Sequence, residues 1–236
     1  MLRARLYLLF LVPFTLLCSI SALLGSLVDG TGFFAHGCAR FWSRWGLRFA
    51  GVKVEVEGLE NIPTDGPVIY MGNHQGNFDV MALTMAIPRR FSWLAKEELF
   101  RIPLFGGAMR RAGYIPLDRS DGRRALKSMD AAAARIRGGA SVIIFPEGTR
   151  TYDGNLLPFK RGGFLLAAKA GVPIVPFTIN GSMAINPRNR IELNPGTLRI
   201  SFAKPISTDG TTAKQRGDLM DQVKEAIVAG LERVAC

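Results

Sequence analysis

The chain has 236 residues, enough for one sizeable hydrophobic core, and its length does not require a second domain. The net charge is +11, and the excess is concentrated in residues 80–170, which hold sixteen Lys and Arg residues against seven Asp and Glu residues. Such a charge would attract anionic lipids, nucleic acid or phosphorylated substrates. Nucleic acid is the less favoured partner because no DNA-binding or RNA-binding motif accompanies the charge. Cys18, Cys38 and Cys236 lie far apart, which excludes a disulfide framework or a zinc site and fits a reducing compartment.

The first segment is an uncharged apolar run, Leu6–Val28, preceded by Arg3 and Arg5. As a helix its 23 residues would measure roughly 34 Å, which is enough to cross the core of a bilayer. Pro13 predicts a kink, and the Asp-Gly-Thr-Gly sequence at 29–32 predicts a turn. A secretory signal peptide is the alternative, although no clean small-x-small cleavage site follows.

The next segment combines an aromatic face with a basic face. The aromatic stripe is Phe34, Cys38, Phe41, Trp42, Trp45 and Phe49, and the basic stripe is Arg40, Arg44 and Arg48. This pattern is typical of a helix in a membrane interface, although a helix that merely packs on the core is an alternative. Because both flanks of the apolar run are basic, the positive-inside rule selects no orientation. We therefore predict that residues 1–50 form a membrane-anchoring helical hairpin that dips into one leaflet, and we favour this arrangement over a true span.

Beyond residue 50, short β-rich runs alternate with helical patterns, which predicts an α/β domain over residues 51–236. We expect a mostly parallel or mixed central sheet of about seven strands flanked by helices, with the N-terminal membrane-associated two-helix motif attached. The predicted strands are Val52–Glu57, Val68–Met71, Ser92–Ala95, Gly113–Leu117, Ser141–Phe145, Ile174–Ile179 and Thr197–Phe202. The predicted helices are Asp79–Ala86, Gly122–Arg137, Gly162–Ala170 and Lys214–Val234. In the last helix, the apolar stripe Met220, Val223, Ile227, Leu231 and Val234 is expected to face the core.

The loop GNHQGNFD at residues 72–79 follows a predicted strand and enters an apolar helix. His74 and Asp79 can face each other only if the histidine lies on the loop and the aspartate in the first helical turn. Gly76 and Asn77 would supply loop flexibility and a helix N-cap. A carboxylate on one imidazole nitrogen fixes the tautomer, so that the other nitrogen can accept a proton. Since the chain lacks a G-x-S-x-G elbow and an activated cysteine, we expect this base to act on a substrate hydroxyl.

A second motif, FPEGTR at residues 145–150, also follows an apolar strand. Its residues suit an anionic ligand: Arg150 can bind phosphate oxygens through two nitrogens, and Gly148 lets a ligand approach the backbone. Glu147 can accept a hydrogen bond from a hydroxyl. Taken in isolation, the motif is also compatible with a Pro-Gly turn that carries a surface Glu–Arg pair.

Together, Asn73-His74-x4-Asp79 and the motif at 145–150 resemble the glycerolipid acyltransferase family, which includes bacterial 1-acylglycerol-3-phosphate acyltransferases. The KEEL and IPLFG sequences within 96–106, followed by GYIPLDR at 113–119, are similar to a further block of that family, and VPIVPF at 172–177 to another. The blocks occur in family order and cover roughly residues 50–205.

The resemblance implies that His74 is the general base, with Asp79 orienting it, and that the acceptor hydroxyl attacks the thioester without an acyl-enzyme. The implied substrate-binding residues are Lys96, Arg119, Glu147, Gly148, Thr149 and Arg150. Of these, Lys96, Arg119 and Arg150 would hold the phosphate of the acceptor, and Glu147 would help to place its glycerol portion. No metal or redox cofactor is implied, and the acyl donor would be acyl-CoA or acyl-acyl-carrier protein, both of which a basic surface attracts.

The acceptor implied by the resemblance is 1-acylglycerol 3-phosphate, acylated at the sn-2 hydroxyl to give phosphatidic acid. Glycerol 3-phosphate or a lyso-ornithine lipid are alternative acceptors, and a thioester hydrolase and a non-enzymatic basic membrane-binding protein are alternative functions. The expected location is the cytoplasmic face of the inner membrane, with a monotopic anchor favoured over a single pass.

Overall fold

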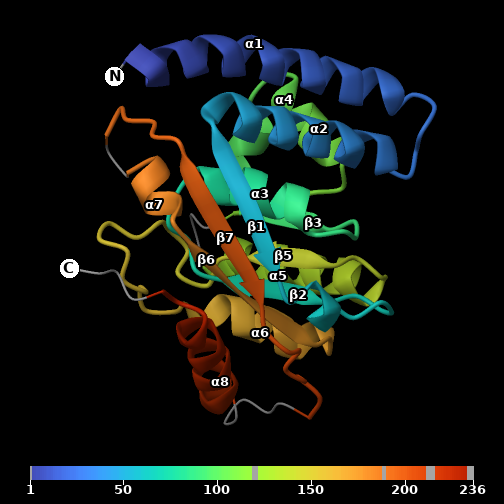
Figure 1. Ribbon diagram of the computed structural model, residues 1–236. Coiled ribbons are helices and arrows are strands. Elements are labelled where there is room, and N and C mark those ends of the chain that lie inside the picture. The colour runs from blue at the N-terminus through green and yellow to red at the C-terminus, as the bar shows by residue number, and fades with distance from the viewer. Residues whose placement is uncertain (1, 119–121, 188–189, 211–215, 233–236) are drawn as a thin grey trace.

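The computed structural model describes residues 2–118, 122–187, 190–210 and 216–232. Its centre is a seven-stranded sheet with the order β1-β7-β6-β2-β5-β3-β4 (Figure 1). The strands are β1 Val52–Glu57, β2 Ile69–Gly72, β3 Ser92–Lys96, β4 Ile115–Leu117, β5 Val142–Ile144, β6 Ile174–Asn180 and β7 Gly196–Phe202. All neighbouring strands pair in parallel except β6 and β7, which are antiparallel. The predicted mixed α/β sheet is therefore confirmed, and each predicted strand is present.

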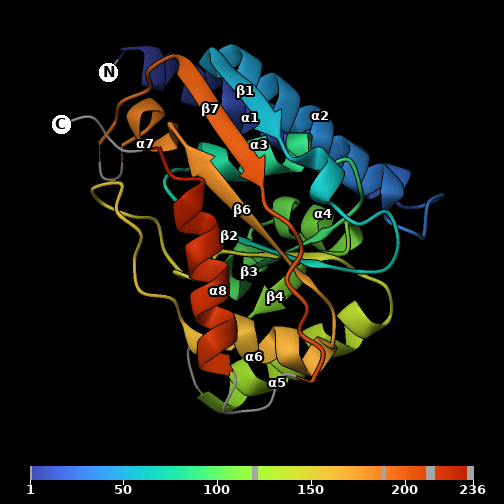
Figure 2. The ribbon, with the colours of Figure 1, turned by 60° about the horizontal axis from the view of Figure 1, so that its bottom comes forward.

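Helices cover both faces of this sheet (Figures 1 and 2). They are α1 Leu2–Gly25, α2 Phe33–Ala50, α3 Phe78–Ala86, α4 Phe105–Arg111, α5 Gly122–Arg137, α6 Arg161–Ala170, α7 Ser182–Ile185 and α8 Arg216–Ala229, with short 3-10 turns at Leu59–Asn61 and Glu97–Arg101. Along β2 the side chains alternate, so that Tyr70 joins the core under α3, whereas Ile69 and Met71 join the core under α5, α6 and α8. The sheet therefore separates two hydrophobic cores.

The sequence did not predict two of these helices, and it placed the end of a third wrongly. The unpredicted helices, α4 and α7, have seven and four residues, which is too short for a helical period to stand out. The last helix ends at Ala229, so Leu231 lies beyond it, and Lys214 and Val234 lie outside the described residues. Val223 and Ile227 are buried as expected.

The N-terminal helices form an antiparallel pair that lies on α3 and α4 (Figure 1). Among the described helices, α1 is long and apolar enough to cross a membrane, and it continues as one helix through Pro13. Its outer side is exposed, as Leu9 (74%) and Leu17 (61%) illustrate. Ala4 and Ala22 nevertheless belong to the same core as α3, so the boundary at residue 50 is not a break in packing and the division into two domains remains a prediction.

The aromatic face of helix α2 packs partly against α1 and is partly exposed. The Phe49 ring lies 3.9 Å from that of Phe10, and the Trp42 indole N–H donates to Thr15 Oγ1 at 2.9 Å, which joins α2 to α1. Phe49 is still 56% exposed. Arg40 does not belong to a free basic stripe, because its guanidinium donates to the carbonyl of Ile87 at 2.5 Å, at the end of α3. The packing of α2 on the core is therefore confirmed in part, and its position in a membrane interface stays a prediction.

Candidate active site

His74 and Asp79 meet where β2 ends and α3 begins. His74 Nδ1 lies 2.7 Å from Asp79 Oδ2, with the histidine on the loop and the aspartate in the first helical turn. Asp79 is fully buried, whereas the His74 side chain is 16% exposed. Since Nδ1 donates to the carboxylate, Nε2 is the nitrogen left to accept a proton.

Asp79 is held in place by the loop itself. The same oxygen, Oδ2, accepts the backbone N–H groups of Gln75 at 2.7 Å and Gly76 at 2.9 Å. These contacts place the negative charge at the N-terminal end of α3, where helix N–H groups favour it. The Asp79 side chain therefore closes the turn, and Asn77, which we expected to cap the helix, makes no side-chain cap hydrogen bond.

The imidazole is also fixed from one side by an aromatic ring. The His74 ring stacks on Phe145 with a centroid distance of 3.9 Å and an interplanar angle of 7°. Phe145 follows β5 directly and begins the second motif, so the two strand-end loops meet at this contact. Stacking and the Asp79 hydrogen bond together restrict rotation of the ring, which pre-organises Nε2.

Glu147 is buried and accepts hydrogen bonds from the backbone of two loops. It is 2% exposed; one oxygen accepts the backbone N–H of His74 at 2.7 Å, and the other accepts that of Leu157 at 2.8 Å. Burial raises the pKa of its carboxyl, and the two N–H groups partly oppose that rise. Each oxygen accepts one backbone N–H group, so Glu147 braces the His74 loop, and its role in placing the glycerol portion of an acceptor stays a prediction.

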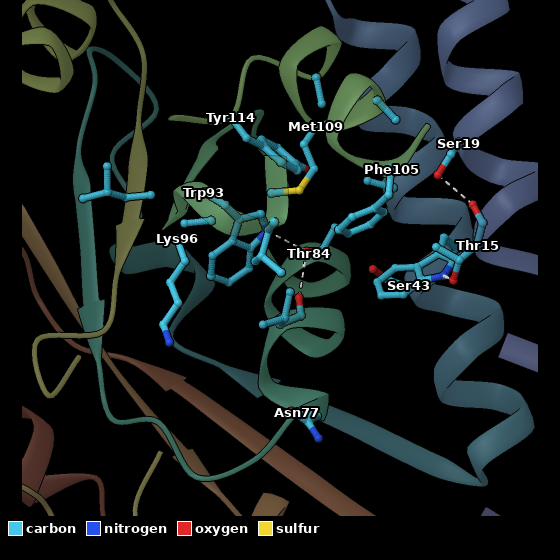
Figure 3. A pocket seen from close by; sticks show the side chains of 18 of the residues that line it. Thr15, Ser19, Ser43, Asn77, Thr84, Trp93, Lys96, Phe105, Met109 and Tyr114 are labelled. Carbon is cyan, nitrogen blue, oxygen red and sulfur yellow. Dashed lines mark hydrogen bonds between the residues drawn. The ribbon is translucent and has the colours of Figure 1, made fainter. Parts of the chain in front are cut away.

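A cavity of about 590 Å³ opens beside His74, between the sheet end and the four helices α1 to α4. Figure 3 shows Lys96 and Asn77 at one end of it and the α1 and α2 side chains Thr15, Ser19 and Ser43 at the other. The walls between them are mainly apolar and include Val80, Leu94, Ala95, Leu99, Phe105, Ala108, Met109 and Ala112. The cavity is thus a largely apolar space with a polar, basic end at His74, which suits an amphipathic ligand.

Most of the predicted binding residues gather at this basic end. Lys96, Gly148, Thr149 and Arg150 line the cavity together with His74. Gly148 has a φ of +70°, and a Cβ there would meet the Lys160 side chain at 3.0 Å, so glycine suits both the turn and the contact. Arg119 lies outside the described residues.

The sequence did not reveal two groups that shape the site. Thr15 and Trp42 line the cavity from α1 and α2, whereas the pattern of these helices indicated membrane contact or packing on the core. Asn77, which donates from Nδ2 to Asn186 Oδ1 at 2.8 Å, also accepts from Arg150 Nη1 at 2.8 Å. Only the position of Asn77 in the first motif could have drawn attention to it. Among the described residues, no group of three or more His, Cys, Asp or Glu residues could hold a metal ion.

Comparison with known proteins gives consistent relationships. Residues 53–180 match the family model described as Acyltransferase. The chloroplastic 1-acyl-sn-glycerol-3-phosphate acyltransferase BAT2 of Brassica napus is 39% identical over 175 residues, which cover 73% of this chain and 50% of that protein. The Arabidopsis thaliana protein LPAT1, of the same description, is also 39% identical over 175 residues, which cover 73% of this chain and 49% of its own. The chain thus spans about half the length of these relatives.

A solved structure matches over the whole chain. The crystal structure of the 1-acyl-sn-glycerophosphate (LPA) acyltransferase PlsC from Thermotoga maritima superposes with a TM-score of 0.78 at 25% identity. The match covers 100% of both chains, so it includes the N-terminal helices as well as the sheet. The arrangement of α1 and α2 on the sheet domain is therefore shared with that protein.

Proposed function

The chain belongs to the acyltransferase family, and from that premise we propose that it acylates the sn-2 hydroxyl of 1-acyl-sn-glycerol 3-phosphate, giving phosphatidic acid. The observation that carries this proposal is the His74–Asp79 pair at the basic end of an apolar cavity of about 590 Å³. A lysophospholipid combines a hydroxyl, an anionic phosphate and an acyl chain, so it matches the three features of this cavity. The similarity to proteins named for this activity supports the same acceptor.

In the proposed reaction, His74 Nε2 removes the proton of the acceptor hydroxyl while Asp79 stabilises the imidazolium that forms. The acceptor oxygen attacks the thioester carbonyl, and the new C–O bond forms as the C–S bond breaks. The departing thiolate takes the proton back from His74. The reaction proceeds without an acyl-enzyme and uses no metal or redox cofactor, since the chain offers a base and the substrate offers the nucleophile.

Substrate binding follows from charge and burial. Arg150 and Lys96 would hold the phosphate, since both line the cavity with His74 and a guanidinium can bind two phosphate oxygens. The donor would be acyl-CoA or acyl-acyl-carrier protein, which the basic surface attracts. The apolar walls would cover an acyl chain and exclude water, which protects the thioester from hydrolysis.

We propose that α1 and α2 anchor the protein on the cytoplasmic face of the inner membrane, as a monotopic hairpin rather than a single pass. Exposed apolar side chains such as Leu9, Leu17 and Phe49 support this, because their burial in lipid is favourable. Since both helices also line the cavity, a lipid acceptor would reach His74 from the membrane without exposing its acyl chain to water.

The test is transfer of a labelled acyl group from a thioester donor, with and without lysophosphatidic acid. Acceptor-dependent formation of phosphatidic acid is expected, and thioester cleavage that proceeds equally without acceptor would indicate a hydrolase. Glycerol 3-phosphate and a lyso-ornithine lipid serve as competing acceptors. His74→Ala should lower transfer by about 10²–10⁴-fold while liposome binding stays unchanged.

A further inference from the structure

We propose that Asn186 is a positioning residue for Arg150, acting through the side-chain amide of Asn77. This inference rests on the proposed function, in which Arg150 holds the phosphate of the acceptor. Asn186 follows α7 and lies beyond residues 53–180, the part of the chain that matches the family model. It does not line the cavity, so any influence on the substrate must pass through other residues.

The connection is a directed chain of three hydrogen bonds. Arg150 Nη1 donates to Asn77 Oδ1, and Asn77 Nδ2 donates to Asn186 Oδ1, each at 2.8 Å. Asn186 Nδ2 in turn donates to the backbone carbonyl of Glu192 at 2.8 Å. The backbone N–H of Asn186 donates to the Ser182 carbonyl at 3.2 Å, which holds the residue at the end of α7.

The direction of this chain matters because an asparagine amide has one accepting end and one donating end. If the Asn77 amide turned over, its NH₂ group would face the guanidinium of Arg150, and two donors would oppose each other. Asn186 prevents this because its oxygen accepts from Asn77 Nδ2. The Glu192 carbonyl, which can only accept, fixes the orientation of Asn186 in the same way. The backbone at Glu192 thus sets the orientation of both amides.

The consequence concerns the binding of the acceptor. Arg150 has a long side chain whose ordering costs conformational entropy, and a pre-oriented guanidinium loses less on binding phosphate. Asn77 supplies that pre-orientation from the N-terminal end of α3, next to the His74 loop. Loss of Asn186 should therefore weaken binding of the phosphate-bearing acceptor and leave the chemistry at His74 intact.

The decisive experiment compares steady-state kinetics of wild type, Asn186→Ala and a control, Asn194→Ala. Asn194 Nδ2 donates to the Ala184 carbonyl at 3.0 Å, so it ties the same segment to α7 without joining the chain of hydrogen bonds. Asn186→Ala should raise KM for lysophosphatidic acid about three- to tenfold, the range expected for one lost hydrogen bond, with kcat and the donor KM within about twofold. Asn194→Ala should change neither constant.

A second pair of variants, built on Asn77→Asp, tests whether Asn186 acts on Arg150 through Asn77. A carboxylate presents an oxygen in both of its orientations, so Asn77→Asp removes the need for an orienting partner. In that background, adding Asn186→Ala should no longer raise KM. An unchanged KM in the single variant, an equal rise in Asn194→Ala, or the same rise in the Asn77→Asp background would each overturn the proposal. A wild type that transfers no acyl group to lysophosphatidic acid would contradict the proposed function, whereas an active wild type whose variants lack the expected KM ratios would contradict the role of Asn186 alone.

Discussion

One buried carboxylate follows each of the neighbouring parallel strands β2 and β5, Asp79 in the first turn of α3 and Glu147 in the loop after β5, and the two have different partners. Asp79 holds an imidazole that reaches the cavity, whereas each oxygen of Glu147 accepts one backbone N–H group. In the proposed reaction the first carboxylate supports the chemistry, whereas the second supports the loop that carries His74. A charged residue in a functional motif can therefore be structural.

The largest expected effect concerns Asp79. Asp79→Asn should lower kcat by about 10²–10⁴-fold, because an amide facing Nδ1 no longer stabilises the imidazolium and can select the wrong tautomer. Acyl-transfer rates at saturating substrates measure this. Asp130→Asn is the control, since that carboxylate is exposed and pairs with Lys169 on the other side of the sheet. A kcat within tenfold of wild type would remove Asp79 from the proposed chemistry.

Arg150 tests whether the second loop contributes directly to binding. Arg150→Ala should raise KM for lysophosphatidic acid about 10- to 100-fold, the range expected for lost charge-assisted hydrogen bonds, with a smaller effect on kcat. Arg137→Ala is a matched control, because that guanidinium donates to the Lys169 carbonyl on α6, on the opposite side of the sheet. Equal KM values for the two variants would contradict a phosphate-binding role.

Glu147 should show the opposite profile, with stability affected before chemistry. In Glu147→Gln one of the two backbone N–H groups faces an NH₂ group, which should lower the free energy of unfolding by about 1–3 kcal/mol. Chemical denaturation in detergent micelles measures this loss, with the exposed Glu57→Gln as control. The acyl-transfer rate should fall only to the extent that the loss of this hydrogen bond displaces the His74 loop. A full loss of kcat in a variant of wild-type stability would instead assign Glu147 to the reaction.

The smallest expected effect is a pH dependence. Burial raises the pKa of Glu147 above 4.5, so the folded protein binds this proton more tightly than the unfolded chain does. The stability from this group is fully present below its unfolded pKa and is lost as the pH rises through the folded pKa. The stability advantage of wild type over Glu147→Gln should therefore shrink as the pH rises above 4.5, and denaturation at several pH values checks the sign. An advantage that grows over that interval would contradict a raised pKa.

The pairing of His74 with Asp79 could be predicted because it is local. Five residues and a strand-to-helix junction leave few arrangements, and the strong strand pattern before the loop located that junction. The convergence of the loops after β2 and β5 was also predictable in outline, since the carboxyl ends of parallel strands lie at one edge of a sheet. The hydrogen-bond partners of Glu147 could not be predicted, because its side chain could equally have faced a ligand.

The sequence by itself determined the strands, most of the helices, the motif pair and the family resemblance, because hydrophobic period and local spacing depend on neighbouring residues. Only the tertiary structure decided that α1 and α2 line the cavity and that Glu147 braces the loop. It also decided that the side chain of Asn77 connects Arg150 to Asn186, which lies 109 positions after Asn77 in the chain. These relations depend on which buried polar groups find partners once distant segments pack, and hydrogen-bond satisfaction across the whole fold is not encoded in any local pattern.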